Sequence, residues 1–255
     1  MENLREIFAS GSEYDAAIAE TGTKFLEGRV PHLGQRMRYR DGREFVFCST
    51  EADFVAGEMV AINQLIATES ANIGVVTSAG SSTLQLDTTG VNFGGGAGIL
   101  AANKLAGGFI ALTDDTGEGY LYKIKSHIAG TAAIQIIFTL YDPIKVAVGV
   151  NVDVCFVVNP FALVKEGTAT SNIIGSAMVP TTASTDGVVQ YFWVQCKGPA
   201  ICLGSGTVGV PIASAAAGAV ADSVEAGSGA YDTIVGTGIS TTANGYVVVW
   251  LNLGI

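Results

Sequence analysis

The chain is poor in charge and in the residue types that most often carry chemistry. Charged residues make up 14% of its 255 residues, and it holds 2 His and 4 Cys, whereas an average domain has about 25% charged residues. No GxSxG, HExxH or P-loop pattern occurs, and two histidines leave little from which to build a zinc site or an activated nucleophile. We therefore expect neither an enzyme nor a bound metal or cofactor.

Long apolar runs and a basic surface are absent as well. No run approaches the 18–20 apolar residues of a membrane span, and Met1–Ser12 lacks the apolar segment of a secretory signal. We expect a soluble protein or a component of an assembly, with no membrane partner. The formal net charge of −10 argues against a nucleic-acid partner, because phosphate contacts need a basic face. So little charge favours a stable oligomer or a lattice, in which much of the exterior is contact surface.

Two motifs resemble ligand-binding motifs but lack the flanking sequence or the spacing that such motifs require. Gly96–Ala101 matches a GxGxxA dinucleotide fingerprint, but no hydrophobic strand precedes it and Gly107 ends any following helix within two turns. The carboxylates of Asp114, Asp115 and Glu118 do not follow the every-second-residue spacing of a calcium loop. We interpret the acidic segment as a structural turn.

The four cysteines form no CxxC motif. Cys48, Cys155 and Cys196 lie in apolar or aromatic segments typical of strands, and Cys202 follows shortly after. Neither histidine is near a cysteine in the sequence. We expect free thiols buried as small hydrophobic side chains, rather than disulfides or metal ligands.

What the chain does contain is a pattern of short strands and turns. Its 33 glycines, with Thr and Ser, divide short runs of Val, Ile, Ala and Phe. This composition predicts an all-β fold of short antiparallel strands in β-sandwich or barrel modules. A strand–turn–strand unit is expected over 107–126, with Tyr122 and Ile124 on the face opposite Lys123 and Lys125.

The clearest hairpin joins Arg36–Arg40 to Arg43–Ser49 through Asp41-Gly42. The period of two places Arg36, Arg38 and Arg40 on one face of the first strand, opposite Met37 and Tyr39. This ladder of arginines is either a contact for an acidic protein surface or a solvated face whose charge is balanced by nearby carboxylates such as Glu44. The sequence leaves both interpretations open.

A repeated pattern organises the C-terminal part. Asn172–Gly198 and Thr233–Gly254 each contain an Ile/Val pair, a glycine, a Thr-Thr-Ala triplet, an Asp-Gly or Asn-Gly turn and a strand with a tryptophan. This order predicts a duplicated β unit. The segment between the copies, 198–229, is expected to be a soft insert, and its second part from Ala213 is either helical or a loop with a strand.

These patterns divide the chain into three parts. Residues 1–35 predict an N-terminal arm with one or two short helices, since Leu4, Ile7 and Phe8 have helical spacing. Residues 36–165 are expected to form a β domain, and residues 166–255 a second β module with the internal repeat.

The order of segments over 33–255 resembles virion structural proteins of tailed bacteriophages, and among them capsid decoration (cement) proteins. The segments that carry the resemblance are LGQRMRYRDGREFVFCST, GGFIALTDDTGEGYLYKIKSH, FVVNPFALV, GVVQYFWVQCKGPA and IVGTGISTTANGYVVVWLNL. The resemblance implies many copies, as trimers or dimers, bound to the major capsid protein on the outside of the virion head after assembly in the host cytoplasm. Our candidate contact residues for the capsid or a neighbouring subunit are Arg29, Arg36, Arg38 and Arg40.

Two alternatives remain. The chain could be a tail, head-fibre or vertex component, which sequence does not distinguish from a decoration protein. It could also be a glycan-binding β module, which would have exposed aromatic side chains beside carboxylates in one groove. Trp193 and Trp250 occupy equivalent places in the two repeated strands, so we expect paired core residues there rather than a sugar platform.

Overall fold

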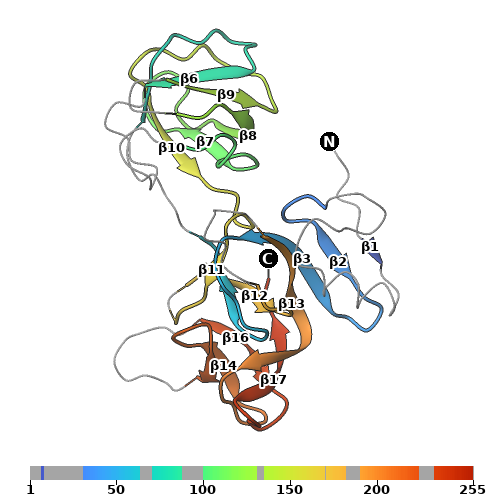
Figure 1. Cartoon of the computed structure of the whole chain (residues 1–255). Coiled ribbons are helices and arrows are strands. Elements are labelled where there is room, and N and C mark those ends of the chain that lie inside the picture. The colour runs from blue at the N-terminus through green and yellow to red at the C-terminus, as the bar shows by residue number, and fades with distance from the viewer. Residues whose placement is uncertain are drawn as a thin grey trace. The chain divides into compact units, whose positions relative to one another are not determined.

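The computed structural model describes residues 7–8, 31–63, 71–87, 100–130, 135–169, 171–181, 190–223 and 233–254 (Figure 1). Every helix or strand assigned within these ranges is a β-strand, which confirms the all-β prediction. The chain divides into two compact units: Gln64–Pro160 forms one, and Met1–Asn63 with Phe161–Ile255 forms the other. We call them the barrel and the host body. This division differs from the expected linear boundaries, since the barrel interrupts the body in sequence.

The barrel is a closed ring of six antiparallel strands in the order β10-β5-β6-β9-β8-β7. The strands are β5 (Ala71–Ile73), β6 (Thr83–Asp87), β7 (Phe109–Leu112), β8 (Leu121–His127), β9 (Ile136–Leu140) and β10 (Asp153–Val157). Closure leaves no open edge in this sheet. The predicted unit over 107–126 is confirmed as β7 and β8.

Alternation along the strands builds the barrel core. On β8, Tyr122 and Ile124 are buried while Lys123 and Lys125 are exposed, as the period of two predicts. The buried side chains include Phe138, whose ring centroid lies 5.5 Å from that of Phe156. The barrel therefore has a hydrophobic core of its own.

The host body is built on one large sheet. Its main path runs β1-β2-β3-β13-β17-β16-β14-β15, and β12, β4 and β11 branch from β13. The strands are β1 (Ile7–Phe8), β2 (Arg36–Arg38), β3 (Glu44–Thr50), β4 (Met59–Ala61), β11 (Lys165–Glu166), β12 (Ile173–Ala177), β13 (Gln190–Leu203), β14 (Pro211–Ser214), β15 (Val220–Asp222), β16 (Ile234–Gly238) and β17 (Tyr246–Asn252).

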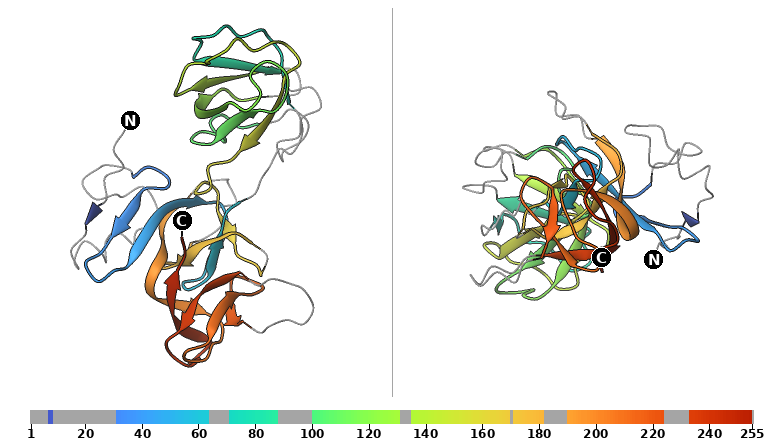
Figure 2. Two further views of the ribbon diagram at one scale, coloured as in Figure 1. Left: turned by 180° about the vertical axis from the view of Figure 1, so that it is seen from behind. Right: turned by 90° about the horizontal axis from the view of Figure 1, so that it is seen from below.

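The 14-residue strand β13 holds this sheet together. Its first half pairs with β3 and its second half with β17, and the register shifts at a bulge between Gln195 and Lys197. Figure 2 shows β13 in orange between β3 in blue and β17 in red. Side chains of β13 enter three hydrophobic clusters, through Phe192 in one, Trp193 in a second and Cys202 in a third. The predicted soft insert is thus wrong over its first residues, because β13 continues to Leu203. Further along, β14 and β15 agree with the alternative of a loop with a strand and not with a helix.

The barrel is inserted at a pair of neighbouring strands. β4 and β11 pair antiparallel, with Ala61 opposite Lys165. Strand neighbours lie about 5 Å apart, so the host body holds the two chain ends of the insertion side by side. In the host body the inserted sequence occupies the place of a hairpin loop.

The repeated segments fold as two similar antiparallel pairs, β12 with β13 and β16 with β17. Gly175 and Gly236 take equivalent places: a Cβ at either would collide with a carbonyl oxygen of the partner strand, that of Gln195 or Trp250. Trp250 therefore corresponds in space to Gln195 rather than to Trp193. The expectation of two equivalent core tryptophans is wrong for Trp250, which is 49% exposed, whereas Trp193 is 5% exposed.

The two described dipeptide turns use different geometry. Asn244 and Gly245 both have positive φ, 52° and 79°, as in a type I′ hairpin. At Asp41-Gly42 only Gly42 has positive φ, 89°, and Tyr39 N–H donates to Arg43 O. This is the longer hairpin loop that closes with a glycine bulge. The other predicted turn, Asp186-Gly187, lies outside the described residues.

At the N-terminus, Ile7–Phe8 is a strand that pairs in parallel with β2, Ile7 opposite Met37 and Phe8 opposite Arg38. The helix expected from the spacing of Leu4, Ile7 and Phe8 is therefore wrong at these two residues. Apart from β1 and residues 31–35, the predicted arm lies outside the described residues.

Candidate interaction surfaces

Arg36 and Arg38 of the arginine ladder lie on β2, one strand from the edge of the host sheet, and Arg40 lies in the turn that follows. Arg36 and Arg40 are exposed and Arg38 is half-buried, while Met37 and Tyr39 are buried on the opposite face. This confirms the predicted alternation. Arg29, the fourth candidate contact residue, lies outside the described residues.

One member of the ladder is neutralised within the chain. Arg38 Nη2 lies 2.9 Å from Glu44 Oε1, and Lys197 Nζ lies 3.4 Å from the same oxygen. The solvated-face interpretation therefore holds at Arg38, which finds Glu44 as a partner. A contact between Arg36 or Arg40 and an acidic surface stays a prediction.

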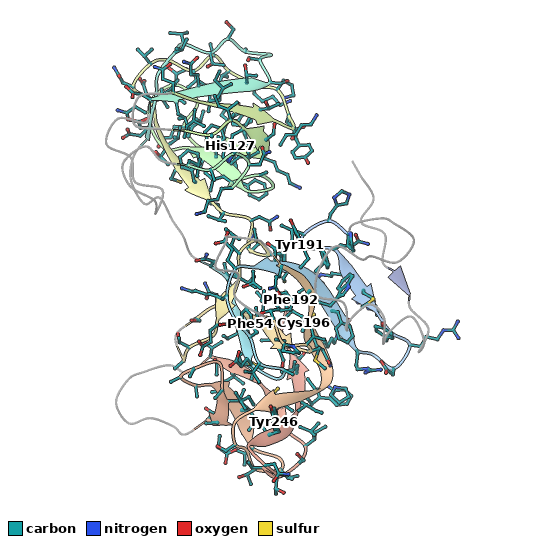
Figure 3. All side chains as sticks on the ribbon, in the orientation of Figure 1. Phe54, His127, Tyr191, Phe192, Cys196 and Tyr246 are labelled. Atoms are coloured by element: carbon teal, nitrogen blue, oxygen red, sulfur yellow. The ribbon has the colours of Figure 1, made fainter. Side chains whose placement is uncertain are left out.

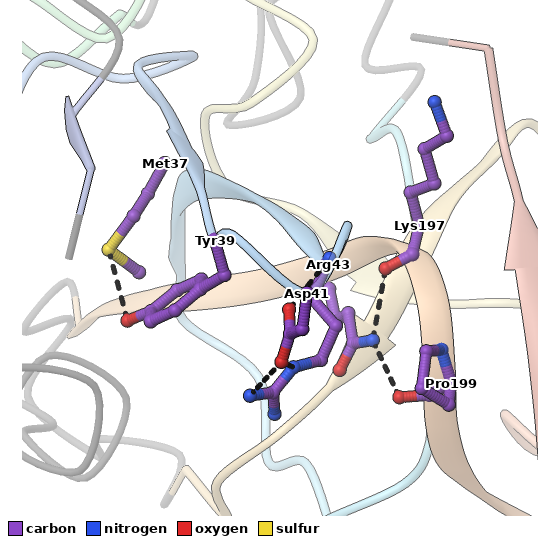
Figure 4. A network of polar contacts seen from close by, with 7 residues as sticks. Met37, Tyr39, Asp41, Arg43, Lys197 and Pro199 are labelled. Carbon is purple, nitrogen blue, oxygen red and sulfur yellow. Dashed lines mark hydrogen bonds and ion pairs between the residues drawn. The ribbon is translucent and has the colours of Figure 1, made fainter. Parts of the chain in front are cut away.

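The adjoining hairpin loop is fixed by its own ion pair (Figure 4). Arg43 Nε donates to Asp41 Oδ2 at 2.7 Å, and the Arg43 guanidinium carbon lies 5.4 Å from the centroid of the Tyr39 ring. The hydrogen bond from Arg43 holds the pKa of the Asp41 carboxyl below its ordinary value of 3.8. The loop that follows the arginine ladder thus has a defined shape at neutral pH.

A buried amide stabilises the bulge in β13. Gln195 Nε2 donates to the carbonyl oxygens of Lys197 at 3.0 Å and Pro199 at 2.9 Å. Gly198 between them has φ of 83°, which a glycine adopts without strain. These contacts set the direction in which β13 leaves its pairing with β3 and joins β17, so they position the outward side chains of the second half.

The second half of β13 and its neighbours form an exposed face that is mostly apolar. We call it the Trp250 face; its outward residues are Lys197, Pro199 and Ile201 on β13, Val248, Trp250 and Asn252 on β17, and Thr237 on β16. The inward residues Val247, Val249 and Leu251 fill the host core. The sequence did contain a signal that Trp250 is exposed. By the period of two, Trp250 lies on the same face as Asn252 and on the face opposite three aliphatic residues. The repeat indicated the contrary, because it paired Trp250 with Trp193.

Groups that could carry chemistry are buried in structural roles. The thiols of Cys48, Cys196 and Cys202 are buried, as predicted, whereas Cys155 is half-buried on the outer side of the barrel. Burial raises the pKa of Cys196 to about 11 and that of Cys202 to about 12, and raises the pKa of Cys48 well above 9.0. These three thiols stay protonated at neutral pH and are poor nucleophiles.

His127 is a structural residue of the barrel (Figure 3). Its Nε2 accepts a hydrogen bond from Leu105 N–H at 3.0 Å, and its Nδ1 lies 2.9 Å from Ile128 O, to which it donates in that tautomer. Burial lowers the pKa of His127 from 6.5. Both ring nitrogens are used, so the imidazole holds the 100–107 loop to the end of β8.

The acidic turn is likewise structural. Asp114 Oδ1 accepts a hydrogen bond from Asp153 N–H at 2.6 Å, which ties the turn after β7 to β10. Among the described residues, no group of three or more His, Cys, Asp or Glu side chains is arranged to hold a metal ion. None of the described segments forms a helix of the length and apolarity needed to cross a membrane.

Comparison with known proteins gives no relative for this chain. No family model matches it, and neither a curated protein nor a solved structure does so.

Proposed function

We propose that this chain is a structural protein of a bacteriophage virion that binds the outside of the capsid lattice and stabilises it. The proposal rests on the resemblance of residues 33–255 to capsid decoration proteins and on one structural observation. That observation is the pair of exposed arginines, Arg36 and Arg40, near the edge of the sheet of a chain with a net charge of −10. Its partner would be the major capsid protein.

The position of these arginines supports a contact role. Arg36 lies on β2 and Arg40 in the turn after it, and β2 has the two-residue β1 as its outer neighbour. A sheet edge accepts further extended segments through backbone hydrogen bonds. A cationic strand at such an edge suits an acidic surface, because complementary charge raises the rate of encounter and fixes the register. Many copies on a lattice would multiply modest individual affinities.

The first experiment is the copy number of this chain relative to the major capsid protein in purified particles, measured by quantitative mass spectrometry. A ratio of one-to-one or another simple lattice fraction is expected for a decoration protein. A handful of copies per particle would move the chain to a tail, head fibre or vertex. Absence from particles would overturn the virion role.

The second experiment tests the arginine contact directly. Arg36→Glu combined with Arg40→Glu should weaken binding to capsids stripped of this protein about tenfold or more, because two attractive charges become repulsive. The matched control is Lys125→Glu with Lys145→Glu, which makes the same charge change at exposed lysines of the barrel. Sedimentation of protein with capsids measures both. Equal binding by the two double variants would contradict a contact through Arg36 and Arg40.

A further inference from the structure

The Trp250 face has the composition of a small-ligand platform. Trp250 stands between Pro199 on β13 and Thr237 on β16, its direct cross-strand partners. Directly opposed residues have Cβ atoms about 5 Å apart. Trp250, which is 49% exposed, therefore lies between two shorter side chains. An aromatic ring presented in this way offers a flat apolar surface to the C–H face of a sugar ring.

Polar groups border one end of the platform. Asn252 follows Trp250 on the same face, and its cross-strand partner is Lys197. Lys197 is also a diagonal neighbour of Trp250, at about 7–8 Å, within reach of a long side chain. Among the described outward residues of β13, β16 and β17 on this face, Lys197 is the one charged side chain.

The charge at this end is positive. Glu44 Oε1 is shared by Arg38 at 2.9 Å and Lys197 at 3.4 Å, so one carboxylate faces two cations. The Glu44 side chain is 11% exposed, whereas that of Lys197 is 46% exposed. The ammonium group is therefore the part of this cluster that meets the solvent, and it is complementary to an anionic ligand.

The extent of the face favours a small ligand over a second copy of the chain. A stable protein interface takes about 20–30 residues from each side. The apolar outward residues on β13 and β17 are four, Pro199, Ile201, Val248 and Trp250, and Pro211 and Ile239 continue the face beside Thr237 and Val248. These six are far fewer than such an interface uses. Covering them with a protein would also bury the polar groups of Lys197, Asn252 and Thr237, each of which would then need a partner.

We propose that the Trp250 face binds an acidic oligosaccharide, such as a uronate-containing segment of a cell-surface polysaccharide. One sugar ring stacks on Trp250, its carboxylate meets Lys197, and Asn252 and Thr237 bond hydroxyl groups. This site uses neither Arg36 nor Arg40, the arginines that we assign to the capsid contact, and it does not depend on that assignment.

The chain contains two tryptophans, one exposed and one buried, which gives a built-in probe. In the unmodified protein acrylamide should quench Trp250 and spare Trp193. The measurement follows this quenching with increasing hexagalacturonate, hyaluronan hexasaccharide, an alginate hexamer or a sialic-acid hexamer, and with maltohexaose as the neutral comparison. We expect at least one acidic oligosaccharide to protect Trp250 with a saturable dependence. Trp250→Phe removes the protected fluorescence and identifies its source.

The charge contact is tested by Lys197→Gln. This variant should bind the protecting oligosaccharide about 5–10-fold more weakly, and added salt should weaken binding by the unmodified protein. Failure of all four acidic oligosaccharides to protect Trp250 overturns the proposal. So does equal protection by maltohexaose with no effect of Lys197→Gln. Protection that grows with protein concentration alone would instead assign the face to a second copy.

Discussion

At the scale of single residues, His127 illustrates how burial fixes a protonation state. Its Nε2 accepts the Leu105 N–H, which a protonated imidazole cannot do, and burial lowers its pKa from 6.5. The unfolded chain therefore takes up a proton at higher pH than the folded barrel. The stability contributed by neutral His127 is complete above pH 6.5 and is lost progressively as the pH falls below it.

We expect this group to add up to about 1.4 kcal/mol per pH unit to the loss of barrel stability below pH 6.5. Urea unfolding of the protein and of His127→Gln, at pH 7.5 and pH 5.0, measures the contribution. The variant is less stable at pH 7.5 but should lose less stability on acidification. The same loss in both proteins would contradict the assignment.

The cysteines give a second prediction at this scale. Cys155 lies half-buried on the outer side of β10, whereas the other three thiols are buried with raised pKa values. A thiol reagent such as Ellman's reagent should modify one group rapidly in the native protein at pH 8 and four in denaturant. Cys155→Ser should abolish the rapid phase. Two or more rapid groups in the native protein would show that a second thiol is accessible.

At the scale of strands, the two repeated pairs depend on glycines that permit close approach. A Cβ at Gly175 would collide with Gln195 O, and a Cβ at Gly236 with Trp250 O. Because the neighbouring atom is backbone in both cases, Gly175→Ala or Gly236→Ala should destabilise the host body by about 1–3 kcal/mol.

Gly254→Ala is the matched control, since no atom lies within 4 Å of a Cβ at that position and its φ is not positive. It should change the free energy of unfolding by less than about 0.5 kcal/mol. Thermal or urea unfolding followed by tryptophan fluorescence reports the host body, in which both tryptophans lie. Alanine variants at 175 and 236 as stable as that at 254 would refute the close approach.

Local patterns predicted where strands form, whereas the repeat did not predict which residues of its two copies occupy equivalent positions. The hairpin of β2 and β3 and the alternation of Lys123 and Lys125 with buried neighbours follow from the period of two, a property of neighbouring residues. The exposure of Trp250 does not follow from the repeat, because the paired strands place Trp250 at the position of Gln195, two residues past Trp193. Trp193 is buried in part because Phe47 of β3 packs against it, and a contact between residues so far apart in the sequence leaves no local signal.

The domain boundaries show the same limit. The pairing of β4 with β11, and of β3 with β13, joins segments separated by about 100 and 140 residues. No local signal marks such pairs. Domain boundaries placed at turns therefore grouped residues 36–63 with the barrel, although they belong to the host body. For the arginine ladder, sequence predicted the exposed face, but not that Arg38 and Lys197 share Glu44.

At the scale of the molecule, the barrel should be separable. Residues 64–160 contain a closed strand ladder and a hydrophobic core. Expressed alone, they should unfold in one cooperative transition, followed by circular dichroism. The host body with this segment replaced by a short Gly/Ser linker should keep its own transition, because β4 and β11 are already adjacent. A barrel fragment without cooperative unfolding would contradict its autonomy.

The central place of β13 also determines the order in which the chain can fold during synthesis. The barrel strands are complete once Val157 has left the ribosome, but β3 must wait for β13, about 140 residues further along. At 5–20 residues per second that delay is roughly 7–28 s. During it Phe45 and Phe47, buried in the finished protein, lack their partner strand. In the last part of that delay, between Val157 and β13, the chain carries a complete set of barrel strands beside an unpaired face of β3.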